Sequence, residues 1–232
     1  GNAELIQVVL TLNVPEALGF EPERYPYPLV IRRNPRPQGF SDNHNRVFRE
    51  HAQGATAYCV LNPDVRLPAN TLARLFTRLR SAPDCGLVAP AVYDPHGRLE
   101  ASGRPLPSPS ELLRKAVRLM LRRTATAPDS IVQPDWVAGM FMLFSSEAYA
   151  RIGGFDEAYF LYYEDVDICC RLRLAGLNLL YCPDISITHS AQRRSHHDLR
   201  HLGWHLQGLL RFFFSPYYRQ YRLKYGQADG SL

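Results

Sequence analysis

Short apolar segments alternate with segments of helical spacing in the N-terminal half of the chain. Apolar positions three and four residues apart predict helices over residues 43–52 and 68–80. Strands that alternate with helices in this way predict an α/β fold with a mostly parallel central sheet flanked by helices. Apolar, β-branched runs predict the strands, the first of them buried, at residues 5–12, 29–32, 55–61 and 86–93.

The connection between the first two strands does not suit a helix. Four prolines lie between residues 15 and 28, so we expect an irregular crossover there. The chain starts at Gly1 rather than at methionine. We therefore expect a processed chain or one that lacks upstream residues, with a shortened N-terminal half.

A basic amphipathic helix is predicted over residues 108–123. Residues 108–111 (Ser-Pro-Ser-Glu) form a capping box, and leucines then alternate with arginines at helical spacing. Such a helix can lie on an anionic membrane surface, or it can pack on the core with its basic face in water.

Glycine marks a strand and the end of a short helix in the next segment. Residues 136–144 predict a strand that Gly139 interrupts, where a ligand or another backbone segment can come close. Ser145 then caps a short helix that ends at Gly153.

An acidic helix and two short strands follow. Residues 164–174 have helical spacing, and Gly176 stands at the position of a left-handed C-terminal cap. Residues 178–182 and 185–188 predict strands, and His189 follows directly after the second. A histidine there is available as a metal ligand, or it is a hydrogen-bonded surface residue.

Composition limits the class of protein. A chain of 232 residues with 46% apolar residues can bury the core of one α/β domain. The net charge of +5 comes almost entirely from arginine, which suits phosphate contacts but equally reflects genome bias. Five cysteines without metal-finger spacing favour a reduced, cytosolic compartment. No apolar run approaches the roughly 18–20 residues of a transmembrane helix.

Carboxylates gather at the start of the helix over residues 164–174. Glu164 and Asp165 lie in its first turn, where the helix dipole favours the ionised form, so either can act as a general base. Acidic residues are also common in first helical turns, and Asp167 with Arg171 makes an ordinary ion pair four residues apart.

Two other stretches have chemistry that suits a phosphate or a cation. Gly39 precedes a helix start whose amides can face an anion. Asp64 follows a strand, where it can hold a divalent cation on a diphosphate or simply form a turn with Asn62 and Pro63.

The tail over residues 191–232 is basic and aromatic. It predicts helices that either pack on the domain or lie at a membrane surface. His197, His201 and His205 recur every four residues, which indicates either a zinc site or a solvated basic stripe.

Together these motifs resemble the family 2 glycosyltransferases, in particular the bacterial rhamnosyltransferase-like branch that builds cell-surface polysaccharide. The resemblance covers about residues 29–225. The residues that carry it are Asn34 with Gly39-Phe40 and Asn43-His44-Asn45, Leu61-Asn62-Pro63-Asp64, Trp136-Val137-Ala138-Gly139, Gly153-Gly154-Phe155-Asp156-Glu157 with Phe160, Glu164-Asp165-Val166-Asp167 with Arg171, and His189.

The resemblance implies a single GT-A (Rossmann-like) domain over residues 1–190 and a C-terminal helical extension over residues 191–232. It implies an inverting transferase that moves a sugar from a nucleotide-sugar donor, such as dTDP-rhamnose or a UDP-hexose, to a lipid-linked or polysaccharide acceptor. The implied location is cytoplasmic, with peripheral contact to the inner face of the plasma membrane, and no nucleic-acid partner is expected.

The resemblance also implies roles for individual residues. Asp165 would deprotonate the acceptor hydroxyl with help from Glu164, and Asp64 and His189 would hold Mg²⁺ or Mn²⁺. The donor side would consist of Asn34, Gly39, Asn43, Asn45, Asn62 and Asp64, and the acceptor side of Trp136, Gly139, Phe160 and Asp167.

Two departures from the family pattern leave other functions open. The run at residues 8–13 can match only one of the family's two opening strands, and Asn62 replaces the first acid of the usual acidic triplet. The chain could therefore be a degenerate glycosyltransferase-like binding module. A third function, nucleic-acid binding through the basic tail, has no support in the core.

Overall fold

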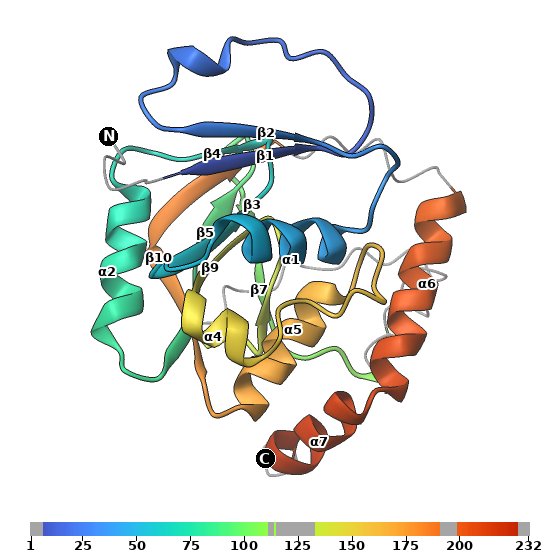
Figure 1. Ribbon diagram of the computed structural model, residues 1–232. Coiled ribbons are helices and arrows are strands. Elements are labelled where there is room, and N and C mark those ends of the chain that lie inside the picture. Colours follow the sequence, from blue (N-terminus) through green and yellow to red (C-terminus); the bar gives the residue numbers. More distant parts are fainter. Residues whose placement is uncertain (1–6, 111–113, 115–132, 191–198, 227–232) are drawn as a thin grey trace.

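The computed structural model describes residues 7–110, 114, 133–190 and 199–226, and it confirms the α/β class (Figure 1). Most of the helix expected over residues 108–123 lies outside the described residues. No helix among the described residues is long and apolar enough to cross a membrane.

The central sheet contains six strands, and most of its strand pairs are antiparallel. Only β5 and β10 run parallel to each other, so the expected mostly parallel sheet is wrong in this respect. A buried strand is an apolar run whichever way it points, so the sequence pattern could not give its direction. In spatial order the strands are β3 (Ala57–Leu61), β9 (Phe141–Ser145), β5 (Cys85–Tyr93), β10 (Asn178–His189) and β4 (Val65–Arg66), with β6 (Leu99–Glu100) beside β5.

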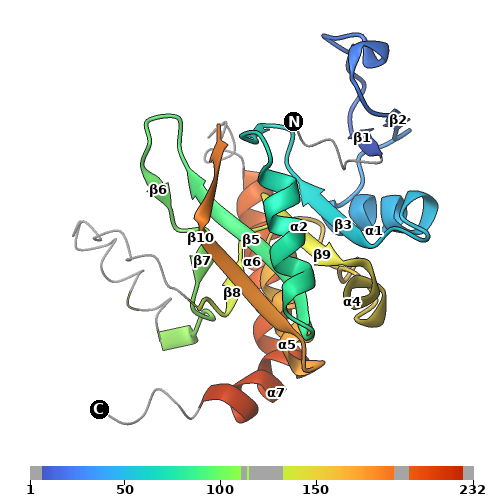
Figure 2. The ribbon, with the colours of Figure 1, turned by 90° about the vertical axis from the view of Figure 1, so that its left-hand side faces the viewer.

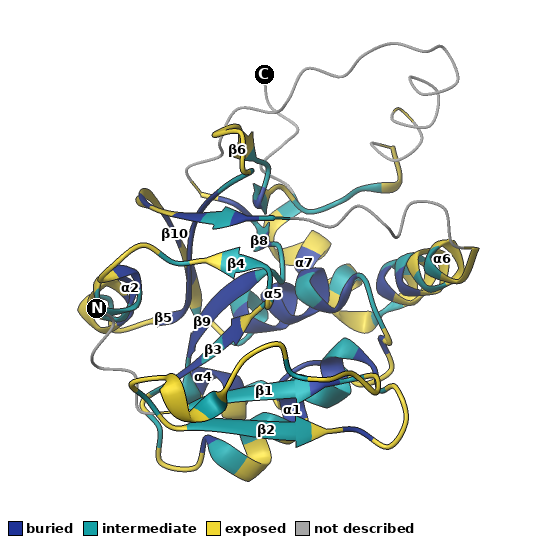
Figure 3. Cartoon of the chain, turned by 90° about the horizontal axis from the view of Figure 1, so that it is seen from above, coloured by how far each residue is buried: buried dark blue, intermediate teal, exposed yellow. Residues whose placement is uncertain are grey.

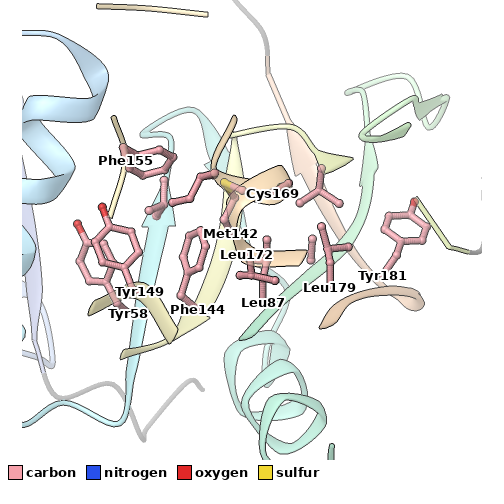
Figure 4. Close-up of a cluster of buried hydrophobic side chains, with 14 of the residues drawn as sticks. Tyr58, Leu87, Met142, Phe144, Tyr149, Phe155, Cys169, Leu172, Leu179 and Tyr181 are labelled. Atoms are coloured by element: carbon pink, nitrogen blue, oxygen red, sulfur yellow. The ribbon is translucent and has the colours of Figure 1, made fainter. Parts of the chain in front are cut away.

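Helices cover both faces of this sheet. On one face α2 (Thr71–Ser81) packs on β5, β9 and β10 through Leu75 and Leu79. On the other face lie α1 (Phe40–His51), α4 (Ser146–Arg151) and α5 (Glu164–Leu174), around a cluster that includes Phe144, Tyr149 and Leu172 (Figure 4).

The N-terminal strands form a separate sheet. β1 (Val8–Leu12) pairs in parallel with β2 (Leu29–Arg33), and the connection between them carries only the short 3₁₀ helix η1 (Pro22–Arg24) (Figure 2). The irregular crossover is confirmed. The expected burial of the first strand is wrong, because only Leu12 of β1 is buried.

Other boundaries differ little from the expected ones. The two strands expected after α5 are one strand, β10, with a register shift between Cys182 and Ser186. Ser145 caps α4 by accepting a hydrogen bond from the Ala148 amide, and Gly176 has a left-handed φ of +79° after α5, as predicted. A small sheet of β7 (Gly103–Arg104) and β8 (Trp136–Val137) lies beside α5.

The two C-terminal helices lie along one side of the molecule. α6 (Leu199–Phe214) packs on the loop before α5, and α7 (Pro216–Tyr225) packs on α5 itself (Figure 1). Phe212 and Tyr221 are buried in this contact. Gly208 has no room for a side chain, because a Cβ there would lie 2.6 Å from the Tyr162 carbonyl oxygen.

Candidate active site

A strained turn delivers the acidic residues at the start of α5. Tyr162 and Tyr163 both have left-handed backbone conformations, with φ of 73° and 70°. Each costs about 1–2 kcal/mol for a residue with a side chain, so packing must hold the turn in place. α6 supplies that packing: the Tyr162 hydroxyl lies 2.9 Å from Nδ1 of His201, and the Tyr163 ring contacts His205.

Asp165 is half-buried and held by backbone amides. Its Oδ2 accepts a hydrogen bond of 3.1 Å from the Gly139 amide, and its Oδ1 accepts one of 2.9 Å from Val166. Desolvation raises the pKa of this carboxyl, while the amides and the nearby Arg104 oppose the shift. A carboxylate that is fixed in direction and poorly hydrated is suited to take a proton.

Glu164, its neighbour, is more deeply buried. Its Oε2 has no hydrogen-bond partner, and burial, followed by repulsion from Asp165, raises its pKa to about 8. Two adjacent carboxyls in a dry place cannot both ionise easily. Glu164 therefore keeps a proton near neutral pH and leaves the negative charge on Asp165.

Asp167 does not face an acceptor pocket. Its side chain is 1% exposed and pairs with Nε of Arg171 at 2.7 Å, and the guanidinium also donates to the Ile152 carbonyl. The expected acceptor-binding role of Asp167 is therefore wrong, since the side chain points into the protein. The ordinary i,i+4 ion pair is confirmed.

A second cluster lies where β4 begins and β10 ends. Oδ1 of Asp64 is 3.3 Å from Nε2 of His189, and Nδ1 of the same ring lies 3.2 Å from Oε2 of Glu100 on β6. β4 and β10 pair at this point, with His189 opposite Val65. The proximity of Asp64 and His189 that the family resemblance implies is therefore observed, and their metal-binding role stays a prediction.

The Asp64–His189 pair has the geometry of two ligands on one hard cation. Adjacent ligands about 2.1 Å from an octahedral ion lie about 3.0 Å apart, close to the observed 3.3 Å. Oδ1 of Asp64 is buried without a hydrogen-bond partner, and Glu100 orients the ring as carboxylates do behind metal-bound histidines. Within the described ranges no three such side chains converge on one ion, so a substrate would have to supply further ligands.

One short backbone segment joins the two clusters. The Gly139 amide contacts Asp165, and the Met140 carbonyl accepts a hydrogen bond of 3.0 Å from the Asn62 amide, two residues before Asp64. A Cβ at Gly139 would meet only ordinary contacts with Phe40 and Asp165. Gly139 therefore serves the site mainly through its amide and by leaving space beside the carboxylate.

Two partly exposed aromatic residues come from segments next to α5: Phe160 from the loop before it and Trp136 from β8, which packs on it. Phe160, 36% exposed, stacks on Trp204 of α6 with ring centres 4.6 Å apart. Trp136 donates from Nε1 to the Pro105 carbonyl, and the Arg104 guanidinium lies 5.3 Å from its ring. Partly exposed rings of this kind can stack on a sugar face, and the acceptor-side roles of Phe160 and Trp136 stay predictions.

Asn34 and Asn43 tie the N-terminal sheet to α1. The Asn34 amide donates to Asn13 at 2.8 Å and to Asn43 at 2.7 Å, and Asn43 also donates to Asn13. Asn13 in turn exchanges two hydrogen bonds with the backbone of Gln38. The donor-side role predicted for Asn34 and Asn43 would have to compete with this network.

Asn45 has no free hydrogen-bonding group. Its amide nitrogen donates to the Phe155 carbonyl and to Glu157, and its oxygen accepts from the Phe155 amide and the Tyr149 hydroxyl. These four bonds use the whole capacity of an asparagine side chain. Asn45 therefore fixes α1 to the turn at Gly154 and cannot also bind a donor.

Gly39 is needed for a close contact. A Cβ there would lie 3.1 Å from Cα and O of Phe160, and the Phe40 amide donates to that carbonyl at 2.7 Å. This first amide of α1 is thus bonded to the protein rather than open to an anion, contrary to expectation. Of the two alternatives for the tail histidines, the zinc site has no support among the described residues, because His201 and His205 contact tyrosines; His197 lies outside those residues.

Comparisons with known proteins find rhamnosyltransferases among the chain's relatives. Rhamnosyltransferase WbbL of Escherichia coli is 43% identical over 89 residues, 36% of this chain and 31% of that protein. The N-acetylglucosaminyl-diphospho-decaprenol L-rhamnosyltransferase of Mycobacterium tuberculosis is 30% identical over 159 residues, 63% of this chain and 51% of that protein. The chain thus spans from 31% to 51% of these relatives' length. No protein-family profile matches it.

A solved structure gives the fold. The crystal structure of GalNAc-T7 with UDP, GalNAc and Mn²⁺ superposes with a TM-score of 0.60 at 15% identity, over 97% of this chain and 45% of that one. The fold is that of the GT-A glycosyltransferases.

Sequence reasoning missed several residues that shape this GT-A site. Glu100 behind His189 and Arg104 near Asp165 come from the hairpin after β5, which has no motif of its own. Trp204 is a lone aromatic in a basic tail. Asn13, which bonds to Asn34 and Asn43, was also missed. Its place at the end of a strand, next to proline-rich sequence, is the one sequence signal that could have indicated it.

Proposed function

We propose that this chain carries the catalytic site of an inverting glycosyltransferase of the family 2, rhamnosyltransferase-like kind. The donor would be a nucleotide sugar, dTDP-rhamnose or a UDP-hexose, and the acceptor a lipid-linked or polysaccharide hydroxyl in glycan synthesis. Both curated relatives are named as rhamnosyltransferases, and the mycobacterial one is named for a diphospho-decaprenol acceptor.

The observation that carries the proposal is the state of Asp165. It is a half-buried carboxylate, aimed by the Gly139 amide, beside a more buried Glu164 that holds a proton. In the proposed reaction Asp165 takes the proton of the acceptor hydroxyl as its oxygen attacks the anomeric carbon. The bond to the diphosphate breaks on the opposite face, so one displacement inverts the configuration.

Asp64 and His189 would hold the divalent cation, Mg²⁺ or Mn²⁺. When bound, such an ion neutralises charge on a leaving diphosphate. Glu100 fixes the His189 ring so that Nε2 faces the Asp64 carboxylate. Asn62, whose amide is held by Met140, would lie beside the sugar or ribose of the donor.

Isothermal titration calorimetry tests the donor site. UDP and dTDP are titrated into the chain with and without Mn²⁺, and again into Asp64→Ala. The proposal expects binding that requires Mn²⁺ and is lost in Asp64→Ala, while Asp165→Asn still binds the nucleotide but transfers no sugar. Nucleotide binding that is equally tight without Mn²⁺ and in Asp64→Ala would contradict the assigned metal pair.

One observation favours a second candidate, a glycosyltransferase-like binding module without donor binding. The β1–β2 pair forms its own sheet rather than extending the central one, and the Asn34 side chain donates a hydrogen bond to Asn43 instead of to a donor. This module would bind an acceptor glycan but show no heat with either nucleotide. The same titrations therefore separate the two candidates.

A further inference from the structure

α6 has an apolar face that points away from the protein. Leu199, Leu202, Leu206, Leu210 and Phe214 recur every three or four residues, so they share one side of the helix. Their exposed fractions are 82%, 65%, 54%, 47% and 83%. We call these five residues the outer face of α6.

The opposite side of the helix already makes its packing contacts. Phe212 is fully buried, Gly208 presses on the Tyr162 carbonyl and Trp204 stacks on Phe160. The outer face is therefore not needed for packing within the described part of the chain. Figure 3 shows α6 at the edge of the molecule, with exposed residues along it. An apolar stripe of this length on a surface marks an interaction site.

The charges around this face favour one kind of partner. No aspartate or glutamate occurs between Leu199 and Gly226. Arg219, Arg222 and Lys224 on α7 are exposed. Asp156, which lies beside α6, is paired with Arg211. An apolar stripe on two helices whose charged residues are all basic matches a bilayer with anionic headgroups, where leucine and phenylalanine enter the acyl boundary and arginine and lysine stay at the phosphates.

We propose that the outer face of α6 docks this chain on an anionic lipid bilayer. The same helix holds Phe160 through Trp204 and Tyr162 through His201, so docking would bring the rim around Asp165 to the membrane surface. A lipid-linked acceptor would then meet the carboxylate without leaving the bilayer. The docking itself depends on α6 and α7 and holds whether or not the chain transfers sugar.

Vesicle co-sedimentation tests the proposal without donor or acceptor. The whole chain is mixed with vesicles of phosphatidylcholine alone and of equal parts phosphatidylcholine and phosphatidylglycerol. We expect binding to the anionic vesicles that weakens with added salt. Leu202→Gln with Leu206→Gln should weaken it by at least about tenfold, because two large apolar groups no longer enter the bilayer.

Two further variants make the result interpretable. Val14→Gln, at an equally exposed apolar residue far along the chain, is the matched control and should bind as the parent does. Gly203→Leu adds an apolar group within the outer face, where a Cβ meets no atom within 4 Å. It should strengthen binding by about fivefold or more, with no sedimentation of the variant when vesicles are left out.

Three outcomes would overturn the proposal. They are no binding to either vesicle, equal binding by the parent and the double glutamine variant, and a concentration-dependent dimer in sedimentation equilibrium that the double variant abolishes. The last outcome would assign the outer face to a second copy of the chain. Because these measurements need no turnover, they stand apart from any failure of the proposed transferase activity.

Discussion

Asp165 and Asp167 lie two residues apart on α5, but their surroundings predict a role in catalysis for the first and in stability for the second. Asp165 is half-buried beside Gly139 at the site, whereas Asp167 is buried against Arg171. Changing each to asparagine keeps the shape and removes the charge. We expect Asp165→Asn to lose activity with the fold intact, and Asp167→Asn to lose stability.

The expected losses of turnover and of stability follow from the contacts of each side chain. Removing a general base costs about 10²- to 10⁴-fold in turnover. Asp165→Asn gives up part of two amide hydrogen bonds but also removes a charge whose raised pKa shows that folding disfavours it, so stability should change by less than about 1 kcal/mol. Asp167→Asn leaves the Arg171 guanidinium buried without its counter-charge, which costs about 3 kcal/mol even though burial raises the pKa of Asp167 as well.

Two assays separate these effects. Release of the nucleoside diphosphate gives turnover, and thermal unfolding gives Tm, which should fall by about 6–12 °C for Asp167→Asn and by under about 4 °C for Asp165→Asn. Turnover by Asp167→Asn, measured well below its Tm, should stay within about threefold of the parent, since the side chain does not reach the site. The reasoning fails if Asp165→Asn keeps its turnover while Asp167→Asn loses it without a change in Tm.

Three other predictions concern the metal pair, α1 and Glu164. Glu100→Gln frees the His189 ring and should weaken Mn²⁺-dependent nucleotide binding by about 10- to 100-fold in calorimetry; unchanged binding would exclude the orienting role. Asn45→Ala strands the Tyr149 hydroxyl and the Phe155 amide, so urea unfolding should show a loss of about 2–4 kcal/mol, and a loss under about 1 kcal/mol would contradict the four-bond assignment. Glu164 ionises near pH 4.5 in the unfolded chain and near pH 8 in the folded one, so the free energy of unfolding should fall as pH rises between these values. Glu164→Gln should flatten this dependence on pH. An unchanged dependence would count against a proton on Glu164.

Local signals in the sequence predicted much of the site. The start of α5, the cap at Gly176 and the interruption at Gly139 all follow from residue types within a few positions. The pairing of Asp64 with His189 was also predicted, although only through the family resemblance. Nothing in the spacing of residues 64 and 189 shows that β4 and β10 lie side by side.

What the sequence could not give depends on distant partners. Asn45 looked available until its contacts with Phe155, 110 residues away, were known. Asp167 has the same residue type as Asp165, but two residues along a helix turn the side chain by about 200°. The Ile152 carbonyl and the Tyr217 ring then hold its partner Arg171. Strand direction in the central sheet was missed for a related reason, because burial depends on neighbours and not on chain polarity.

The contact between Gly39 and Phe160 has a consequence for how the two substrates are handled. The backbone of Phe160 completes the first turn of α1 and fills the space that a side chain at Gly39 would need. If α1 borders the donor and Phe160 borders the acceptor, as proposed, this contact would couple the two sides. An acceptor that shifts Phe160 also shifts the end of α1, so we expect occupancy of one substrate to change the affinity for the other, and the order in which they arrive to matter.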